Sequence, residues 1–137
     1  DDIEKMVPVA FELTEDVDRV TRNHAEGYAF TFGAMGTRSH NFYNAAWARQ
    51  GFADEVREIQ KLWLDGDRDE AKRRVPLEIA TQSNLLGTVD LVTDRLRVYR
   101  AAGVDILRVD VRTEGGMQER LDHLGILLDL VKKVNAE

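Results

Sequence analysis

The clearest pattern of hydrophobic and polar positions lies in residues 85–111, where two short apolar runs flank an amphipathic segment. Apolar residues of the middle segment recur at helical spacing on one face, at Val89, Val92, Leu96 and Tyr99. Thr88 suits the N-cap of this helix, and Gly103 suits the position after it, where a positive φ is common. A strand, a helix and a strand in so short a stretch predict a βαβ unit, which builds a parallel sheet.

Elements before and after this unit are predicted in the same way. The apolar run at residues 6–11 indicates a strand, and Pro8 predicts that it lies at an edge or carries a local irregularity, because proline donates no ladder hydrogen bond. Thr14 and Ser39 suit the N-caps of two later helices. Residues 117–135 predict a last helix with two apolar stripes, one of Leu121, Leu124, Leu128 and Val131 and one of Leu127, Leu130 and Val134. Such a helix needs neighbours on two sides.

Length and composition narrow the class of protein. A chain of 137 residues favours a single domain over residues 1–137. Three parallel strands leave both sheet edges unpaired and one face uncovered, so we expect a second copy of the chain, or further strands, to cover them. The net charge of −6 argues against nucleic acid or an anionic membrane as a partner. The chain has no apolar run long enough to span a bilayer, no signal-peptide pattern and no cysteine, so a cytoplasmic location is expected.

The histidines do not form a recognisable metal-binding pattern. His24, His40 and His123 are far apart in the sequence, and without cysteine no metal site is predicted. His24 falls on an apolar helix face and is expected to be a hydrogen-bonded core or interface residue. His40 is the histidine expected nearest a cleft, and His123 is expected to be solvated.

Several short motifs, in this order and spacing, resemble the luciferase-like monooxygenase superfamily, and within it the branch that uses the deazaflavin coenzyme F-420. They are Gly33-Ala34-Met35-Gly36, Asn41-Phe42-Tyr43-Asn44, Gly66 with Glu70-Ala71 before Val75-Pro76, Leu85-Leu86-Gly87-Thr88, and Tyr99-Arg100-Ala101-Ala102-Gly103 with the strand that follows. The resemblance implies an α/β fold that is the C-terminal portion, about three parallel strands plus helices, of an eight-fold β/α (TIM-type) barrel. A complete barrel needs roughly 250 residues, so we expect a fragment of one.

The resemblance also implies a function. A protein of this branch transfers a hydride between reduced coenzyme F-420 and a small organic substrate, and the protein supplies orientation and electrostatics while the cofactor ring carries the chemistry. FMN is an alternative cofactor, as in an FMN-dependent luciferase-like monooxygenase. A non-catalytic, self-associating α/β module is an alternative of another class. Much of the family's cofactor contact comes from earlier strands, so the isolated 137-residue chain is expected to be inactive.

Two groups of residues are candidates for the site. The cofactor-binding candidates are Gly87, Thr88, Arg108, Asp110 and Arg112, and the substrate-side candidates are Gly33, Met35, Gly36 and Asn41. Strand alternation puts Arg108 and Asp110 on one face, at the carboxyl end where barrel enzymes place binding groups, and an ion pair involving these two charges is an equally weighted alternative. For Gly33 and Gly36 the alternative is a helix end with close backbone packing. Aromatic residues at 28–47 either wall a flavin-like ring or form core or a dimer surface.

Overall fold

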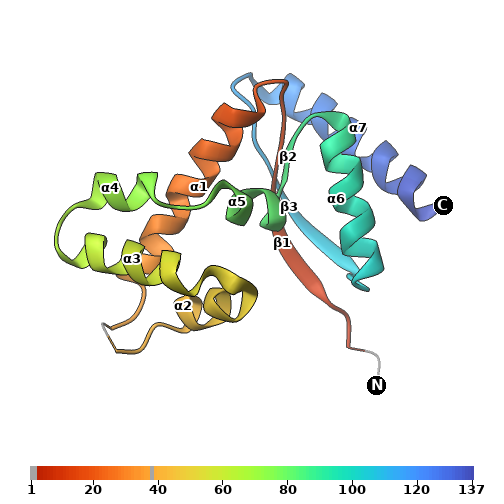
Figure 1. Ribbon diagram of the computed structural model, residues 1–137. Helices are drawn as coiled ribbons and strands as arrows, with labels where there is room; N and C mark the ends of the chain where they lie inside the picture. Colours follow the sequence, from red (N-terminus) through yellow and green to blue (C-terminus); the bar gives the residue numbers. More distant parts are fainter. Residues whose placement is uncertain (1–2, 38) are drawn as a thin grey trace. The chain divides into compact units, whose positions relative to one another are not determined.

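A computed structural model describes residues 3–37 and 39–137. The helices and strands follow in the order β1 (Met6–Leu13), α1 (Val17–Ala34), α2 (Phe42–Trp47), the π-helical turn η1 (Ala48–Phe52), α3 (Ala53–Leu64), α4 (Arg68–Arg73), α5 (Leu77–Ser83), β2 (Leu85–Gly87), α6 (Val89–Ala101), β3 (Ile106–Val111) and α7 (Met117–Asn135) (Figure 1). They form two compact units. The sheet unit comprises the chain up to residue 20 together with residues 81–137, and the helical unit comprises residues 21–80.

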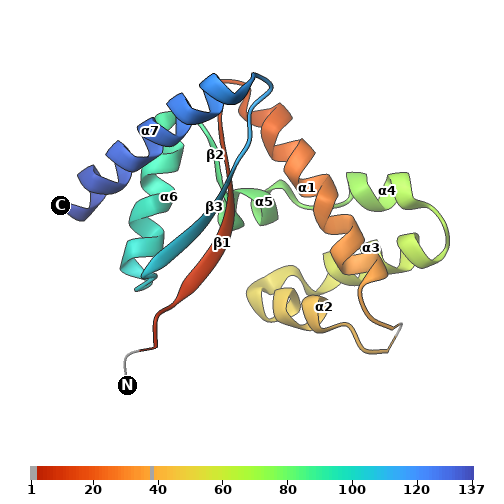
Figure 2. The ribbon, with the colours of Figure 1, turned by 180° about the vertical axis from the view of Figure 1, so that it is seen from behind.

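The three strands of the sheet unit form one parallel sheet in the order β2-β1-β3 (Figures 1 and 2). β1 and β3 pair over six residues, from Met6 opposite Ile106 to Phe11 opposite Val111. β1 and β2 pair over three residues, which begin with Phe11 opposite Leu85. The predicted α/β class, the three parallel strands and the βαβ unit are therefore confirmed. Because β3 lies beside β1, the connection through α6 crosses the central strand.

Pro8 lies in the central strand, so its predicted edge position is wrong. The N–H of Ala10 donates to Oδ1 of Asn84 at 2.9 Å, on the β2 side, whereas the carbonyl oxygen of Phe11 accepts from the N–H of Arg112 at 2.8 Å, on the β3 side. Backbone groups of residues two apart in a strand point to the same side. The backbone nitrogen of Pro8 therefore points to the β2 side, like that of Ala10. β2 begins only at the level of Phe11, so the missing N–H of Pro8 removes no ladder hydrogen bond.

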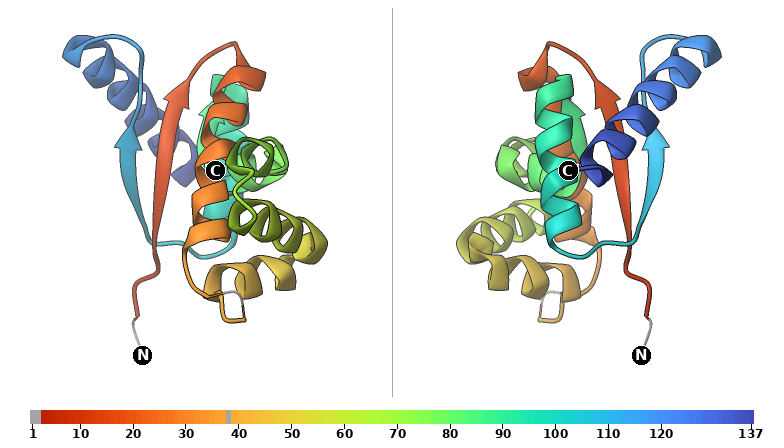
Figure 3. Two further views of the ribbon diagram at one scale, coloured as in Figure 1. Left: turned by 90° about the vertical axis from the view of Figure 1, so that its left-hand side faces the viewer. Right: turned by 90° about the vertical axis from the view of Figure 1, so that its right-hand side faces the viewer.

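α6 and α7 cover one face of the sheet, in front of the strands in the right-hand view of Figure 3. The buried core between the sheet and these helices consists of Val9, Phe11, Leu85, Val92, Leu96, Leu127, Leu130 and Val134. Of the two stripes predicted on the last helix, only the one with Leu127 belongs to this core. Along β3 the residues alternate, and Ile106, Arg108 and Asp110 are exposed on the opposite face. The predicted alternation of this strand is therefore confirmed.

Two helix N-caps differ from the prediction. Asp16, not Thr14, caps α1, and its Oδ1 accepts from the N–H of Arg19 at 3.2 Å. Asn41, not Ser39, caps α2, and its side chain accepts from the backbone N–H three residues later at 3.1 Å. In both places the first turn begins two residues later than predicted, so the nearer side-chain oxygen reaches the free N–H groups.

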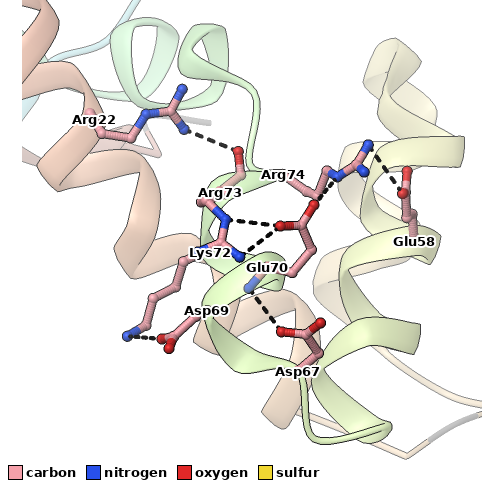
Figure 4. Close-up of polar contacts among 8 residues, drawn as sticks. All are labelled: Arg22, Glu58, Asp67, Asp69, Glu70, Lys72, Arg73 and Arg74. Atoms are coloured by element: carbon pink, nitrogen blue, oxygen red, sulfur yellow. Dashed lines mark hydrogen bonds and ion pairs between the residues drawn. The ribbon is translucent and has the colours of Figure 1, made fainter.

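Ion pairs and a hydrogen bond link α4 to its neighbours in the helical unit (Figure 4). Glu70 accepts from Nε of Arg74 at 2.6 Å and pairs with Nη2 of Arg73 at 2.8 Å, and Arg74 also reaches Glu58 at 3.5 Å. The guanidinium groups of Arg74 and Arg73 lower the pKa of the Glu70 carboxyl. Arg22 of α1 donates to the carbonyl oxygen of Arg73 at 3.4 Å, at the end of α4. α4 is thus tied to both α1 and α3.

Candidate functional site

Three of the predicted site residues lie close together in and just after β3, although Arg108 lies in the middle of this strand and not at its carboxyl end, where it was predicted. Arg108 and Asp110 of β3, with Arg112 just after it, border an open depression of about 570 Å³ whose floor includes Pro8 and Ala10 of β1. This volume is in the range of small-molecule sites. Gly87 ends β2 and Thr88 follows it, on the other side of β1, and neither is among the residues that line this depression.

Asp110 pairs with Arg112 and leaves Arg108 free. Nε and Nη2 of Arg112 both lie 2.9 Å from Oδ2 of Asp110. The side chain of Arg108 has no hydrogen-bond or ion-pair partner among residues 3–37 and 39–137. The ion pair considered between Arg108 and Asp110 is therefore not the one that forms. The depression offers one unpaired guanidinium, which suits an anionic group of a ligand.

The turn at Gly87 and Thr88 uses its polar groups within the sheet unit. Gly87 has a φ of +104°, and a Cβ there would lie 3.0 Å from Cδ1 of Leu91, so only glycine fits without strain. Its carbonyl oxygen accepts from the N–H of Thr14 at 3.0 Å. Oγ1 of Thr88 accepts from the N–H of Leu91 at 3.4 Å, which confirms the predicted cap. A role of these two residues in cofactor binding stays a prediction.

A further charge cluster, at the carboxyl end of the sheet, was missed by sequence reasoning. The guanidinium of Arg19 lies 2.8 Å from Glu114, 3.6 Å from Glu12 and 3.6 Å from Asp16. Glu114 belongs to the loop between β3 and α7, so the cluster joins that loop to β1 and to the start of α1. The i,i+3 pair of Asp16 and Arg19 was readable in the sequence, but nothing local indicates Glu114 as a partner.

The histidines are placed differently from one another. His123 is half-buried rather than solvated, and its Nδ1 is buried without a hydrogen-bond partner among the described residues. The missed signal is its position four residues before Leu127, which puts it on the core-facing stripe of α7. His40 is exposed, and its Nδ1 lies 3.2 Å from Oγ of Ser39, while His24 is half-buried. The described residues contain no group of acidic residues and histidines that could hold a metal ion.

The substrate-side candidates lie together in the helical unit, at the end of α1 and the start of α2. Gly36 has a φ of +117°, and a Cβ there would lie 2.6 Å from the carbonyl oxygen of His40. Nδ2 of Asn41 donates to the carbonyl oxygen of Phe32 at 2.9 Å. Close packing also explains Gly33, because a Cβ there would lie 2.1 Å from Cγ of Trp63 in α3. Met35 is exposed, and a substrate role for these residues stays a prediction.

The aromatic residues nearby pack mainly against one another. The ring centroids of Tyr28 and Phe32 are 6.0 Å apart, and those of Phe32 and Trp47 are 6.2 Å apart. Phe32 is fully buried, whereas Phe42 is exposed. Of the three interpretations, a flavin-like wall, core or a dimer surface, the contacts of Phe32 and its neighbours are those of a core.

Comparisons with known proteins identify the family. Residues 1–106 match the model of the luciferase-like monooxygenase family. The chain belongs to this family. The luciferase-like chain is also 33% identical over 81 residues to a putative coenzyme F-420-dependent oxidoreductase of Mycobacterium tuberculosis (strain H37Rv). That alignment covers 59% of the chain and 23% of the relative, so the chain spans about a quarter of the relative's length. No solved structure matches.

These findings confirm the resemblance read from the motifs at residues 33–36, 41–44 and 85–88, since all three lie within the matched residues. Arg108, Asp110 and Arg112 lie just beyond the matched segment of the luciferase-like chain, as does α7. No helix in the part of the chain that the structure describes combines the length and apolarity needed to cross a membrane.

Proposed function

We propose that this chain forms part of the cofactor-binding end of an oxidoreductase that transfers a hydride between coenzyme F-420 and a small organic substrate. The observation that carries the proposal is the unpaired guanidinium of Arg108, on the exposed face of a parallel sheet, in a luciferase-like chain. The named cofactor of the mycobacterial relative supports F-420, and FMN is the alternative.

In this proposal β1 and β3 are neighbouring strands of an eight-fold barrel. They pair over six residues, whereas β2 contributes only three residues at the carboxyl end of β1. The exposed face with Ile106, Arg108 and Asp110 then points into the barrel, where the other strands cover it. Those strands come from a longer polypeptide or from a second copy of the chain.

The residues of the depression fit the charged part of such a cofactor. Both candidate cofactors carry phosphate, and Arg108 can donate to phosphate oxygens without breaking an existing ion pair. Asp110 holds the guanidinium of Arg112 at the rim, and the carboxylate keeps a second anion away from it. When bound, the deazaflavin ring supplies the hydride chemistry, and these side chains supply position and charge.

Binding of the cofactor to matched variants tests the proposal. The longest polypeptide encoded in this reading frame would be titrated with F-420 and with FMN, alongside the 137-residue chain. We expect Arg108→Gln to weaken binding by about 10-fold to 100-fold, the loss of one charged hydrogen bond. Arg49→Gln, the same change at an exposed residue of the helical unit, should leave binding unchanged. Unaltered affinity in R108Q, or binding of neither cofactor, contradicts the proposal.

The 137-residue chain alone is expected not to bind F-420 tightly or to transfer hydride, because the exposed sheet face lacks a covering layer. Tight saturable binding by this chain contradicts the role proposed for the missing strands. The cytoplasmic location and the small-molecule substrate stay predictions.

A further inference from the structure

The loop after β3 and the start of α7 lie exposed on the sheet unit. Residues 114–122 are all exposed, whereas the helix is anchored in the core only further along, through Leu127, Leu130 and Val134. The N-cap of α7 is Gly116, which has no side chain to bond the free N–H groups of the first turn. A segment with so few buried contacts opens more readily than the core of the unit.

One ion pair ties this segment to the sheet, at the end where the loops after β1 and β3 both lie (Figures 1 and 2). Nη1 of Arg19 lies 2.8 Å from Oε1 of Glu114, and Glu114 has no other side-chain partner in the described part of the chain. We infer that residues 114–122 form a lid, which the Arg19–Glu114 ion pair holds closed and which unwinds when this pair breaks. The inference goes beyond the proposed function and does not depend on it.

The surroundings of Arg19 determine which of its contacts breaks first. Each of its three side-chain nitrogens faces a different carboxylate, since Nη2 lies 3.6 Å from Glu12 and Nε lies 3.6 Å from Asp16. The side chain of Glu12 is only 13% exposed and lies on a strand, and Asp16 also caps α1, so both are fixed in place. Glu114 is 80% exposed and lies in a loop. Its contact is therefore the one that opens, while Arg19 stays with the other two carboxylates.

Opening of the lid changes a second depression, of about 380 Å³, at the carboxyl end of β3. Asp110, Arg112 and Thr113 border it on the strand side, and Arg120 of the lid borders it on the helix side. The side chain of Arg120 has no hydrogen-bond or ion-pair partner among residues 3–37 and 39–137, so only the closed lid keeps its guanidinium at this depression. A ligand there is enclosed on the helix side only while the lid is closed. Arg19 is thus a positioning residue for Arg120.

Hydrogen exchange of the 137-residue chain tests the lid. We expect Glu114→Gln to speed exchange of the amides of residues 120–122 about two-fold to five-fold, the effect of one exposed ion pair. Glu15→Gln should leave it unchanged, because Glu15 is exposed in the loop after β1 and has no ion-pair partner where the structure describes the chain. The effect of E114Q should shrink in about 1 M salt, where the Debye length is about 3 Å. Equal exchange in E114Q and the natural chain at low salt overturns the inference.

Limited proteolysis gives a second measurement, because Arg120 is a trypsin site inside the lid. Trypsin cleaves an unwound segment, so the rate of cleavage after Arg120 follows the population of the open lid. We expect this rate to rise about two-fold to five-fold in E114Q, and at least as much in Arg19→Gln, but not in E15Q. Exchange at residues 127–134 should stay as in the natural chain. Faster exchange along the whole of α7, or cleavage after Arg120 at the natural rate in both E114Q and R19Q, overturns the inference.

Discussion

The backbone of Gly33 in α1 lies against the indole of Trp63 in α3, so closely that a Cβ on the glycine would stand 2.1 Å from Cγ of Trp63. No side chain fits in this space unless one of the two helices moves. Both tryptophans of the chain belong to the helical unit, so their fluorescence reports on its unfolding.

Gly33→Ala should therefore destabilise the helical unit, by about 1–3 kcal/mol or more, because overpacking of a close contact forces the helices apart. Gly27→Ala in the same helix is the matched control, since a Cβ there meets nothing within 4 Å. It should stabilise by about 0.5–1 kcal/mol through helix propensity. Urea unfolding followed by tryptophan fluorescence measures both, and equal effects of the two substitutions contradict the packing argument.

The buried hydroxyl of Thr21 is a second feature that should affect the free energy of unfolding. Its side chain is buried, and its Oγ1 has no hydrogen-bond partner among the described residues. Thr21→Val keeps the shape and removes the unsatisfied hydroxyl, so we expect a gain of about 1 kcal/mol in the free energy of unfolding. The control is Thr93→Val, because the equally buried Thr93 donates to the carbonyl oxygen of Val89 at 2.7 Å. T93V should lose about 0.5–1.5 kcal/mol, and circular dichroism during urea unfolding compares the two.

Glu70 should make the helical unit sensitive to acid. Arg74 and Arg73 lower the pKa of its carboxyl below the ordinary value of 4.5 in the folded chain. The ion pairs therefore stabilise the fold above pH 4.5, and this contribution is lost as the pH falls below 4.5 and through the folded pKa. Glu70→Gln should flatten the fall of stability with acid.

The control for this prediction is Glu26→Gln, because Glu26 has no ion-pair partner in the part of the chain that the structure describes. It should leave the acid dependence as in the natural chain. Melting temperatures from pH 3 to pH 7, read by tryptophan fluorescence, compare the variants. A parallel acid dependence of E70Q and the natural chain would show that the ion pairs of α4 do not matter for stability.

A substitution of Asp110 tests whether its carboxylate repels a bound phosphate or contacts the ligand. If the depression binds the phosphate of a cofactor, Asp110→Asn should strengthen binding about three-fold or more, because it frees Arg112 and removes a repelling charge. Asp54→Asn is the control, since it breaks a comparable pair with Arg57 at 3.0 Å in the helical unit. Cofactor titration of both variants measures the effect. Weaker binding in D110N would mean that this carboxylate itself contacts the ligand.

Local signals explain what could be predicted from the sequence. Thr88 and Gly103 stand at the ends of α6 as predicted, because a cap and a left-handed residue depend only on neighbours in the chain. The alternation of β3 and the span of α7 follow from hydrophobic periods of two and of three to four residues. The family resemblance was readable for a similar reason, since its motifs are short and contiguous.

Contacts between distant residues explain what could not be predicted. The pairing of Asp110 with Arg112 rather than with Arg108 depends on side-chain rotamers, and the contact of Arg19 with Glu114 joins residues far apart in the sequence. His123 was predicted to be solvated because the sequence pattern does not distinguish a polar residue on the core-facing stripe of a helix from one at the edge of that stripe. The division of the chain into two compact units could not be predicted either, because the amino-acid composition gives no signal for it.

The position of Pro8 has a consequence for how the sheet meets other chains. The β2 side of β1 is open below Phe11, and an open edge of this kind invites foreign strands to add to it. An incoming strand would meet the carbonyl acceptor of Pro8 but no N–H donor. The hydrogen-bond ladder between the two strands would therefore be interrupted two residues after Met6. Pro8, whose missing N–H costs the native sheet no ladder hydrogen bond, thus protects this open edge against the addition of further strands.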